Sequence, residues 1–213
     1  MLSRRSFTKT VITGTTALWL GLGGFLLKAW AETKRRVLPQ GVSAESLANQ
    51  QPQHIDASQL EVTPLDRFGT MGLTNHQVDI ESWRLEVSGK VDHPLRLTYA
   101  QVTGLPRVER KELLICPGVF SYQARYQGVM LDVLLQRAGL QTGAQKVVIG
   151  GPAGGRMKQE RFSLAEIEAG RVMLAWAVNG QALPVKHGYP LRLVAPDRYG
   201  DDWVKYVTKI EVS

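Results

Sequence analysis

Residues 187–206 read HGYPLRLVAPDRYGDDWVKY, and they carry much of the evidence in this sequence for its fold. Within and beyond it, Leu191–Val194 and Val204–Val212 are rich in β-branched and aromatic residues, which favours strands. Upstream, Glu112–Cys116 reads as an apolar strand, stopped by a Pro-Gly pair that interrupts regular structure. The single cysteine of the chain is therefore predicted to lie at a strand end, where the chain turns.

The rest of the chain mixes strand signals with signals for short helices. The further strands expected are Trp83–Val87, Lys146–Ile149 and Val172–Val178, and helices are expected at Leu131–Ala138 and after Thr98 and Ser163. Thr98 and Ser163 are each followed three residues later by Gln or Glu, the capping-box pattern of a helix start. Asn179-Gly180 favours a two-residue hairpin turn. No internal repeat is present, so the predicted class is α+β with mixed β-sheets and short helices.

Composition and charge narrow the function classes. A chain of 213 residues with 44% hydrophobic content is long enough for one domain with appendages. The formal charge of +7 suggests an anionic partner until its distribution is considered. Most of the excess lies in residues 1–36, which leaves the remainder close to neutral. Nucleic acid is therefore not expected as a partner.

The beginning of the chain resembles an export signal. Arg4 and Arg5 precede an apolar run over residues 11–27, followed by small residues at Ala29 and Ala31. This pattern resembles the twin-arginine signal, which directs folded proteins across the bacterial inner membrane. Residues 1–36 are thus predicted to be a twin-arginine-type signal or an N-terminal membrane anchor, and both fates stay open. Residues 37–65, rich in Gln, Ser, Ala and Pro, are predicted to form a polar arm without a core.

Several common catalytic and binding templates do not fit. Gly150–Gly155 lacks the GxGxxG order of a dinucleotide site and is interpreted as a flexible loop. The four histidines are far apart and form no HExxH pattern or paired-Cys zinc pattern. No GxSxG elbow and no CxxC pair is present. What remains is a lone cysteine, either a buried hydrophobe or a functional thiol.

Four motifs occur in the order typical of one known family. They are Cys116 after an apolar strand, Tyr126-Gln127-Gly128, His187 to Arg192, and Val204-Lys205-Tyr206. In this order they resemble the sulfite-oxidase-like molybdopterin-binding domain of sulfite oxidases and of the catalytic subunit of periplasmic methionine-sulfoxide reductase. The resemblance covers about residues 66–213, which are predicted to form the oxidoreductase domain.

The resemblance implies a cofactor, molybdenum-molybdopterin, and the residues that bind it. Cys116 would be the catalytic thiolate ligand of the metal, because molybdenum accepts soft sulfur donors. Arg192 and Lys205 would hold the anionic pterin phosphate. The residues that the resemblance places against the pterin are Asn75, His76 and His187. One departure is Asp201-Asp202, which stands where many relatives carry a basic residue.

The same resemblance implies an oxidoreductase that performs oxygen-atom transfer on a small-molecule substrate. The uncharged, partly aromatic run 117–122 after the cysteine favours a neutral sulfoxide or N-oxide, and Arg125 is the first cation after the cysteine. The alternatives are sulfite oxidation by the same site and a cofactor-free periplasmic binding module. The chain has no CxxCH pattern, so a separate electron-transfer protein is expected, either a membrane haem protein or a periplasmic cytochrome. The expected location is the periplasm or the periplasmic face of the inner membrane, and the expected state is a monomer.

Overall fold

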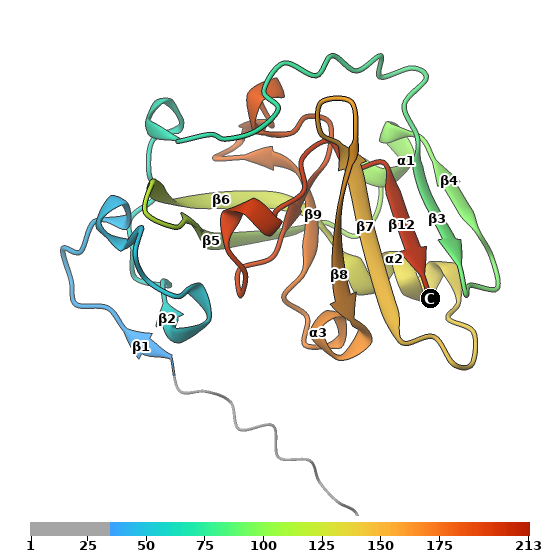
Figure 1. The fold of residues 1–213 in the computed structure, drawn as a ribbon, viewed down its shortest axis with the longest axis horizontal. Coiled ribbons are helices and arrows are strands. Elements are labelled where there is room, and N and C mark those ends of the chain that lie inside the picture. Colours follow the sequence, from blue (N-terminus) through green and yellow to red (C-terminus); the bar gives the residue numbers. More distant parts are fainter. Residues whose placement is uncertain (1–34) are drawn as a thin grey trace, which may run out of the picture. The chain divides into compact units, whose positions relative to one another are not determined.

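Two five-stranded sheets carry the fold in the computed structural model, which describes residues 35–213 (Figure 1). The first sheet has the order β10-β9-β6-β5, with β11 also paired to β9. Its strands are β5 (Val108–Cys116), β6 (Phe120–Met130), β9 (Met173–Val178), β10 (Gln181–Ala182) and β11 (Arg192–Val194). All of its pairs are antiparallel, and the β5–β6 hairpin ends in the pair Cys116–Phe120. Cys116 therefore lies at a strand end beside a turn, as predicted.

The second sheet has the order β4-β3-β12-β7-β8. Its strands are β3 (Leu85–Gly89), β4 (Leu95–Leu97), β7 (Lys146–Pro152), β8 (Met157–Ser163) and β12 (Lys209–Val212). The β3–β12 pair is parallel and the others are antiparallel. The predicted α+β class with mixed sheets is confirmed. A further parallel pair joins β1 (Arg36–Val37) to β2 (Ile55–Asp56).

The helices are short, as the sequence predicts. They are α1 (Tyr99–Thr103), α2 (Leu131–Ala138) and α3 (Leu164–Glu168), with 3₁₀ turns η1 (Ala44–Leu47), η2 (Pro52–His54), η3 (Leu65–Arg67), η4 (Val185–His187) and η5 (Gly200–Asp202). Thr98 and Ser163 each close a capping box with the residue three positions later. The prediction for α2 is confirmed at both ends.

Two predictions of local structure need correction. The Gly-rich stretch 150–155 is not wholly a loop, because its first three residues belong to β7, where Gly151 lies against the backbone of Lys205 and Tyr206. A side chain at Gly151 would begin 2.5 Å from the Lys205 carbonyl oxygen, so this close approach needs glycine. The strand predicted over 204–212 is also shorter, since only Lys209–Val212 pairs in the sheet.

The prediction that residues 37–65 form an arm without a core is wrong. The apolar side chains of this segment pack against strand β5. Together with side chains of β5 they form a second hydrophobic cluster beside the main core. The members of this cluster are Leu38, Ala44, Leu47, Ile55, Leu60, Leu113 and Ile115. The cluster forms because one face of β5 would otherwise expose its apolar side chains to water. In Figure 1 this blue-to-cyan segment lies beside the end of the β5–β6 hairpin.

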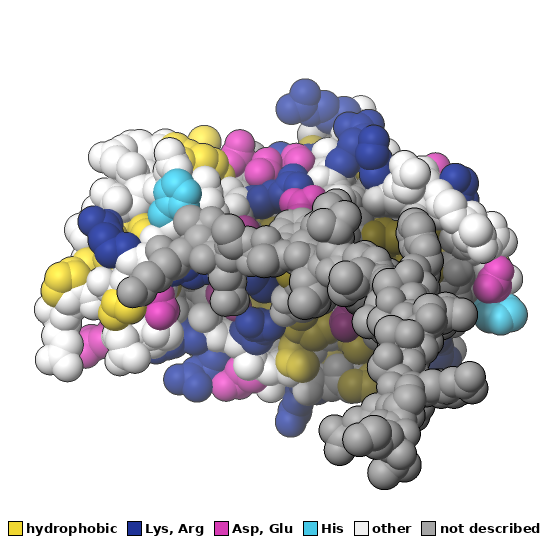
Figure 2. Space-filling model, turned by 90° about the horizontal axis from the view of Figure 1, so that it is seen from below, with side chains coloured by type: hydrophobic (Ala, Val, Ile, Leu, Met, Phe, Trp, Pro, Cys, Tyr) yellow, Lys and Arg dark blue, Asp and Glu magenta, His cyan; other side chains and the backbone are white. Residues whose placement is uncertain are grey.

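Most of the excess positive charge lies in residues 1–36, as does the predicted export signal or membrane anchor. Most of the predicted export signal or anchor lies outside the described residues. Over residues 35–213, no helix is both long and apolar enough to span a membrane. Figure 2 shows basic and acidic side chains interspersed over the described part of one face. This mixed pattern agrees with the near-neutral charge of the folded part.

Candidate functional site

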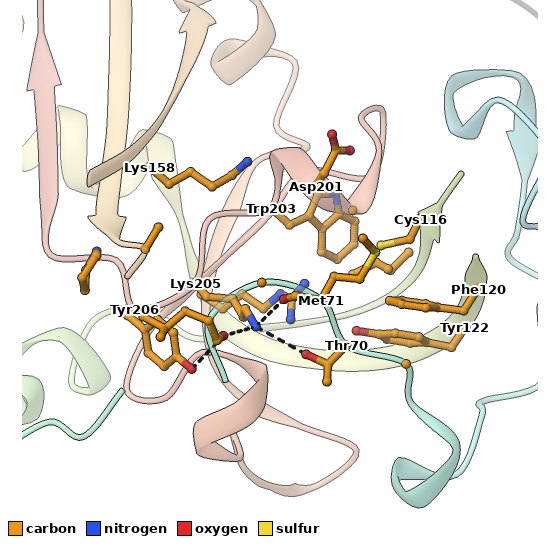
Figure 3. Close-up of a pocket in the computed structure, with 18 of the residues that line it drawn as sticks. Thr70, Met71, Cys116, Phe120, Tyr122, Lys158, Asp201, Trp203, Lys205 and Tyr206 are labelled. Carbon is orange, nitrogen blue, oxygen red and sulfur yellow. Dashed lines mark hydrogen bonds between the residues drawn. The ribbon is translucent and has the colours of Figure 1, made fainter. Parts of the chain in front are cut away.

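A cavity of about 310 Å³ opens beside Cys116 (Figure 3). Three segments that are distant in sequence form its walls: the end of the β5–β6 hairpin, residues 69–73, and the chain from Gly200 to Tyr206. The β7–β8 turn adds a fourth side. The cavity thus brings together two of the stretches singled out from the sequence, the cysteine strand and the C-terminal motif.

Cys116 lies on the cavity wall, with only 6% of its surface exposed. Gly200, which also lines the cavity, approaches so closely that a β-carbon there would lie 3.0 Å from the cysteine Sγ and 2.6 Å from Leu114. Burial raises the pKa of the Cys116 thiol, and the nearby charges of Arg192 and Lys205 oppose that rise. A metal bound at this sulfur would remove the proton outright.

An aromatic wall stands next to the cysteine. Tyr122 stacks on Phe68 at 4.0 Å between ring centroids, and the Phe120 and Tyr122 rings are nearly parallel at 6.0 Å. Gly69 lies directly against the Phe120 ring, where a β-carbon would overlap the aromatic atoms. Met71 lines the same region, as Figure 3 shows. The part of the cavity near the thiol is therefore apolar and shaped by tight packing.

Arg192 begins β11 and is 5% exposed, yet it lines the cavity. Its Nη1 donates to the His187 carbonyl oxygen at 2.9 Å, and its guanidinium lies 5.7 Å from the Trp203 ring centroid. Within residues 35–213, its Nε has no hydrogen-bond partner. A buried cation with a donor left over is suited to bind an anion.

Lys205 also lines the cavity, but its ammonium has hydrogen-bond partners. Nζ donates to the carbonyl oxygens of Met71 and Lys186 at 2.9 and 3.0 Å and to that of Leu73, and it lies 3.3 Å from Thr70 Oγ1. Burial, followed by the charge of Arg192, lowers the pKa of Lys205 to about 8. Lys205 therefore holds the 70–73 wall in place and contributes a positive charge to the cavity.

The other three predicted site residues do not line this cavity. His187 is 1% exposed, packs edge-on against Phe68, and has no partner for either ring nitrogen within the described part of the chain. Burial, followed by the charge of Arg192, lowers the pKa of His187 to about 4, so the ring is neutral near pH 7. His76 packs against the Tyr206 ring at 5.0 Å, and Asn75 is exposed. The pterin contacts of these three residues stay predictions.

Two cations that sequence reasoning missed also line the cavity. Arg156 and Lys158 come from the β7–β8 hairpin, and Lys158 is paired with Glu160 at 3.2 Å. No motif marked them, because β8 was not predicted. Arg125, which sequence proximity had suggested, is instead paired with Glu109 at 3.2 Å and does not line the cavity.

This donor set fits a cofactor that combines a soft metal centre with an anionic group. Cys116 offers one sulfur ligand on the cavity wall, and Arg192, which lines the same cavity, offers a positive charge. These properties are compatible with a cofactor that binds a metal through a protein sulfur atom.

Residues 72–213 match the family model described as oxidoreductase molybdopterin binding domain. The chain belongs to this family, and the resemblance seen in its motifs is confirmed. It is accordingly an enzyme, a molybdopterin-binding oxidoreductase whose cofactor is molybdenum-molybdopterin.

Comparisons with individual proteins agree with this assignment. The chain is 34% identical over 136 residues to the uncharacterized oxidoreductase YuiH of Bacillus subtilis, covering 63% of this chain and 67% of that protein. It is 26% identical over 140 residues to the putative protein-methionine-sulfoxide reductase subunit YedZ1 of Azospira oryzae, covering 64% and 51%. It is 30% identical over 167 residues to the NAD(P)H nitrate reductase of Hordeum vulgare, covering 64% and 19%. The chain thus spans two thirds of the first relative, about half of the second and about a fifth of the third.

A solved structure shows the same fold. The sulfane dehydrogenase SoxCD from Paracoccus pantotrophus superposes with a TM-score of 0.61 at 23% identity, covering 95% of this chain and 56% of that one. The predicted sulfite-oxidase-like architecture is confirmed.

Proposed function

We propose that this enzyme reduces a neutral sulfoxide or N-oxide by oxygen-atom transfer, with Cys116 as the molybdenum ligand. When bound, the cofactor supplies the two-electron redox chemistry of the reaction. Reducing a sulfoxide takes two electrons and two protons, and it gives the sulfide and water. The relative named as a methionine-sulfoxide reductase subunit supports this substrate class.

The observation that carries the proposal is the character of the wall beside Cys116. Phe120, Tyr122 and Met71 present apolar surface there, which favours an uncharged substrate through burial of its apolar groups. Arg125 does not face this region, because it is paired with Glu109. The first cation after the cysteine therefore gives no support for an anionic substrate.

The chain's own residues then have distinct tasks. Cys116 supplies the thiolate, and the aromatic wall excludes water and orients the substrate. Arg192 binds the pterin phosphate through its remaining donors, while Lys205 acts on the same group as a point charge.

Sulfite oxidation is the second candidate, and one observation favours it. Arg156, Lys158, Arg192 and Lys205 all line the cavity, and a dianion needs such cations. Lys158 is partly neutralised by Glu160, which leaves Arg156 as the main added charge. Family membership argues against the remaining alternative, a cofactor-free binding module.

Turnover by the purified holoenzyme tests the substrate class. With a reduced viologen as electron donor, we expect reduction of methyl p-tolyl sulfoxide or trimethylamine N-oxide to exceed sulfite oxidation, measured with ferricyanide as electron acceptor, by at least about tenfold in kcat/KM. Arg156→Ala should leave the sulfoxide rate nearly unchanged, like the control Arg125→Ala. The second candidate would be supported if sulfite oxidation were the faster reaction and its rate fell in Arg156→Ala but not in Arg125→Ala. Nitrate is tested as a third substrate.

Electrons are proposed to come from a separate protein. The single cysteine of the chain excludes a CxxCH haem attachment site within it. A periplasmic cytochrome or a membrane haem protein would fit the expected compartment.

Export by the twin-arginine route is proposed from the sequence alone. A cofactor assembled in the cytoplasm must cross the membrane inside a folded protein, and this route carries folded proteins. Replacing Arg4 and Arg5 together by Lys is expected to leave the enzyme in the cytoplasm, as measured by cell fractionation. The paired replacement of Lys34 and Arg35 by Gln is the control. Periplasmic delivery of the Arg4/Arg5 variant at the wild-type level would contradict the route.

A further inference from the structure

The turn that follows Cys116 is held from behind by residues 44–48. The backbone N–H of Gly118 donates to the Ala48 carbonyl oxygen at 3.0 Å. The Ser121 hydroxyl donates to the Ala44 carbonyl oxygen at 2.6 Å in a buried position. Gly118 has a left-handed φ of +71°, which glycine adopts readily. The turn after Cys116 and the beginning of β6 are thus tied to η1 and the residue that follows it.

The two faces of β5 divide between the cavity and this segment. Successive side chains of a strand point to opposite faces. Leu114 and Cys116 line the cavity, whereas Leu113 and Ile115 pack in the second hydrophobic cluster with Leu47. Residues 44–48 therefore support the end of β5 on the face opposite to the one that carries the Cys116 thiol.

Gly200 packs closely against the thiol on the cavity face of β5. The Cα–H of Gly200 leaves no room for a β-carbon between it and the Cys116 sulfur. The cysteine strand end is thus packed between η5 in front and η1 behind, and Figure 1 shows the blue-to-cyan segment beside the hairpin end. A shift of either support would move the sulfur.

We propose that residues 44–48 position Cys116 for ligation, and that Ser121 is the main positioning residue. This inference rests on the proposed role of Cys116 as the metal ligand. The segment lies outside residues 72–213 that match the family model, so this chain supplies the support from its own N-terminal region. Groups that orient a metal ligand typically change affinity or activity by about 10–100-fold when they are removed.

Two variants test this role, and each has a matched control. Ser121→Ala removes the hydroxyl bonded to Ala44, and Ser121→Thr restores a hydroxyl at the same position. Leu47→Ala opens the cluster behind the turn, whereas Leu60→Ala opens it near Lys111, whose Nζ donates to the Leu60 carbonyl oxygen. Each holoenzyme is assayed for molybdenum content, thermal midpoint, thiolate-to-molybdenum absorption and sulfoxide turnover.

We expect Ser121→Ala and Leu47→Ala to retain molybdenum but shift the absorption band and lower turnover by roughly tenfold. Ser121→Thr should restore both properties. Leu60→Ala should lower the thermal midpoint as Leu47→Ala does, with the band unchanged. If Ser121→Ala keeps the wild-type absorption band and turnover rate, the positioning role is wrong, but the ligand assignment stands. The same conclusion follows if Leu60→Ala shifts the band as much as Leu47→Ala does. Absence of the band from the wild-type holoenzyme overturns the proposed ligation itself, and this role with it.

Discussion

Replacement of Cys116 by Ser is expected to remove the thiolate-to-molybdenum absorption and to lower turnover by more than about a hundredfold. This loss of turnover is larger than the effect of about 10–100-fold that follows removal of a group that only orients a metal ligand, because here the ligand itself is lost. Serine nearly preserves the volume, but its oxygen is a harder donor whose hydroxyl stays protonated near neutral pH. Molybdenum content, visible spectrum and sulfoxide reduction are measured on both forms from the same host.

The effect on folding separates a ligand from an inert core cysteine. Cys116 is buried, so a poorly satisfied serine hydroxyl should cost at most about 1–3 kcal/mol of unfolding free energy. The domain should therefore still fold, and pterin can still bind through Arg192 and Lys205. A variant with the wild-type spectrum and rate would show that Cys116 is not the ligand.

Arg192→Ala is expected to reduce cofactor retention by more than about tenfold. Removing one partner of a buried charged pair costs about 2–5 kcal/mol of binding free energy. Arg192 is buried, lines the cavity and has an Nε without a hydrogen-bond partner among residues 35–213, whereas Arg107 is exposed and does not line the cavity. Molybdenum occupancy after purification is the measurement, and Arg107→Ala is the control.

Loss of fold must be separated from loss of the cofactor contact in this experiment. Arg192 also donates to the His187 carbonyl oxygen and packs on Trp203, so its removal lowers stability as well. Arg192→Lys keeps the charge without the two parallel donors and should give intermediate occupancy. Equal molybdenum occupancy in Arg192→Ala and Arg107→Ala, with both folded, would contradict the phosphate role.

The local elements of the fold were largely predictable because their signals are local. The helix at Leu131–Ala138 ends at a glycine, and both capping boxes are closed by residues three positions apart. The core of residues 37–65 was not predictable, because its apolar side chains sit on short turns without a regular period. Strand β6 was not predicted either, because two of its buried side chains are polar. Its buried Ser121 and Gln123 bond to backbone carbonyls of that same segment.

The candidate site was predictable in part. Cys116, Arg192 and Lys205 line one cavity, as their order in the motifs implied. The partners of Lys205 were not predictable, since its acceptors come from residues 70–73 and from Lys186. Arg156 lines the cavity only because β7 and β8 pair, and no local signal marks that pairing.

X-ray absorption at the molybdenum edge tests the central claim most directly. The spectrum reports the sulfur atoms bound to the metal, so it detects the Cys116 ligand without reference to any substrate. The ligand assignment predicts one sulfur neighbour fewer in Cys116→Ser than in the wild-type holoenzyme. The same number of sulfur neighbours in both forms would contradict it.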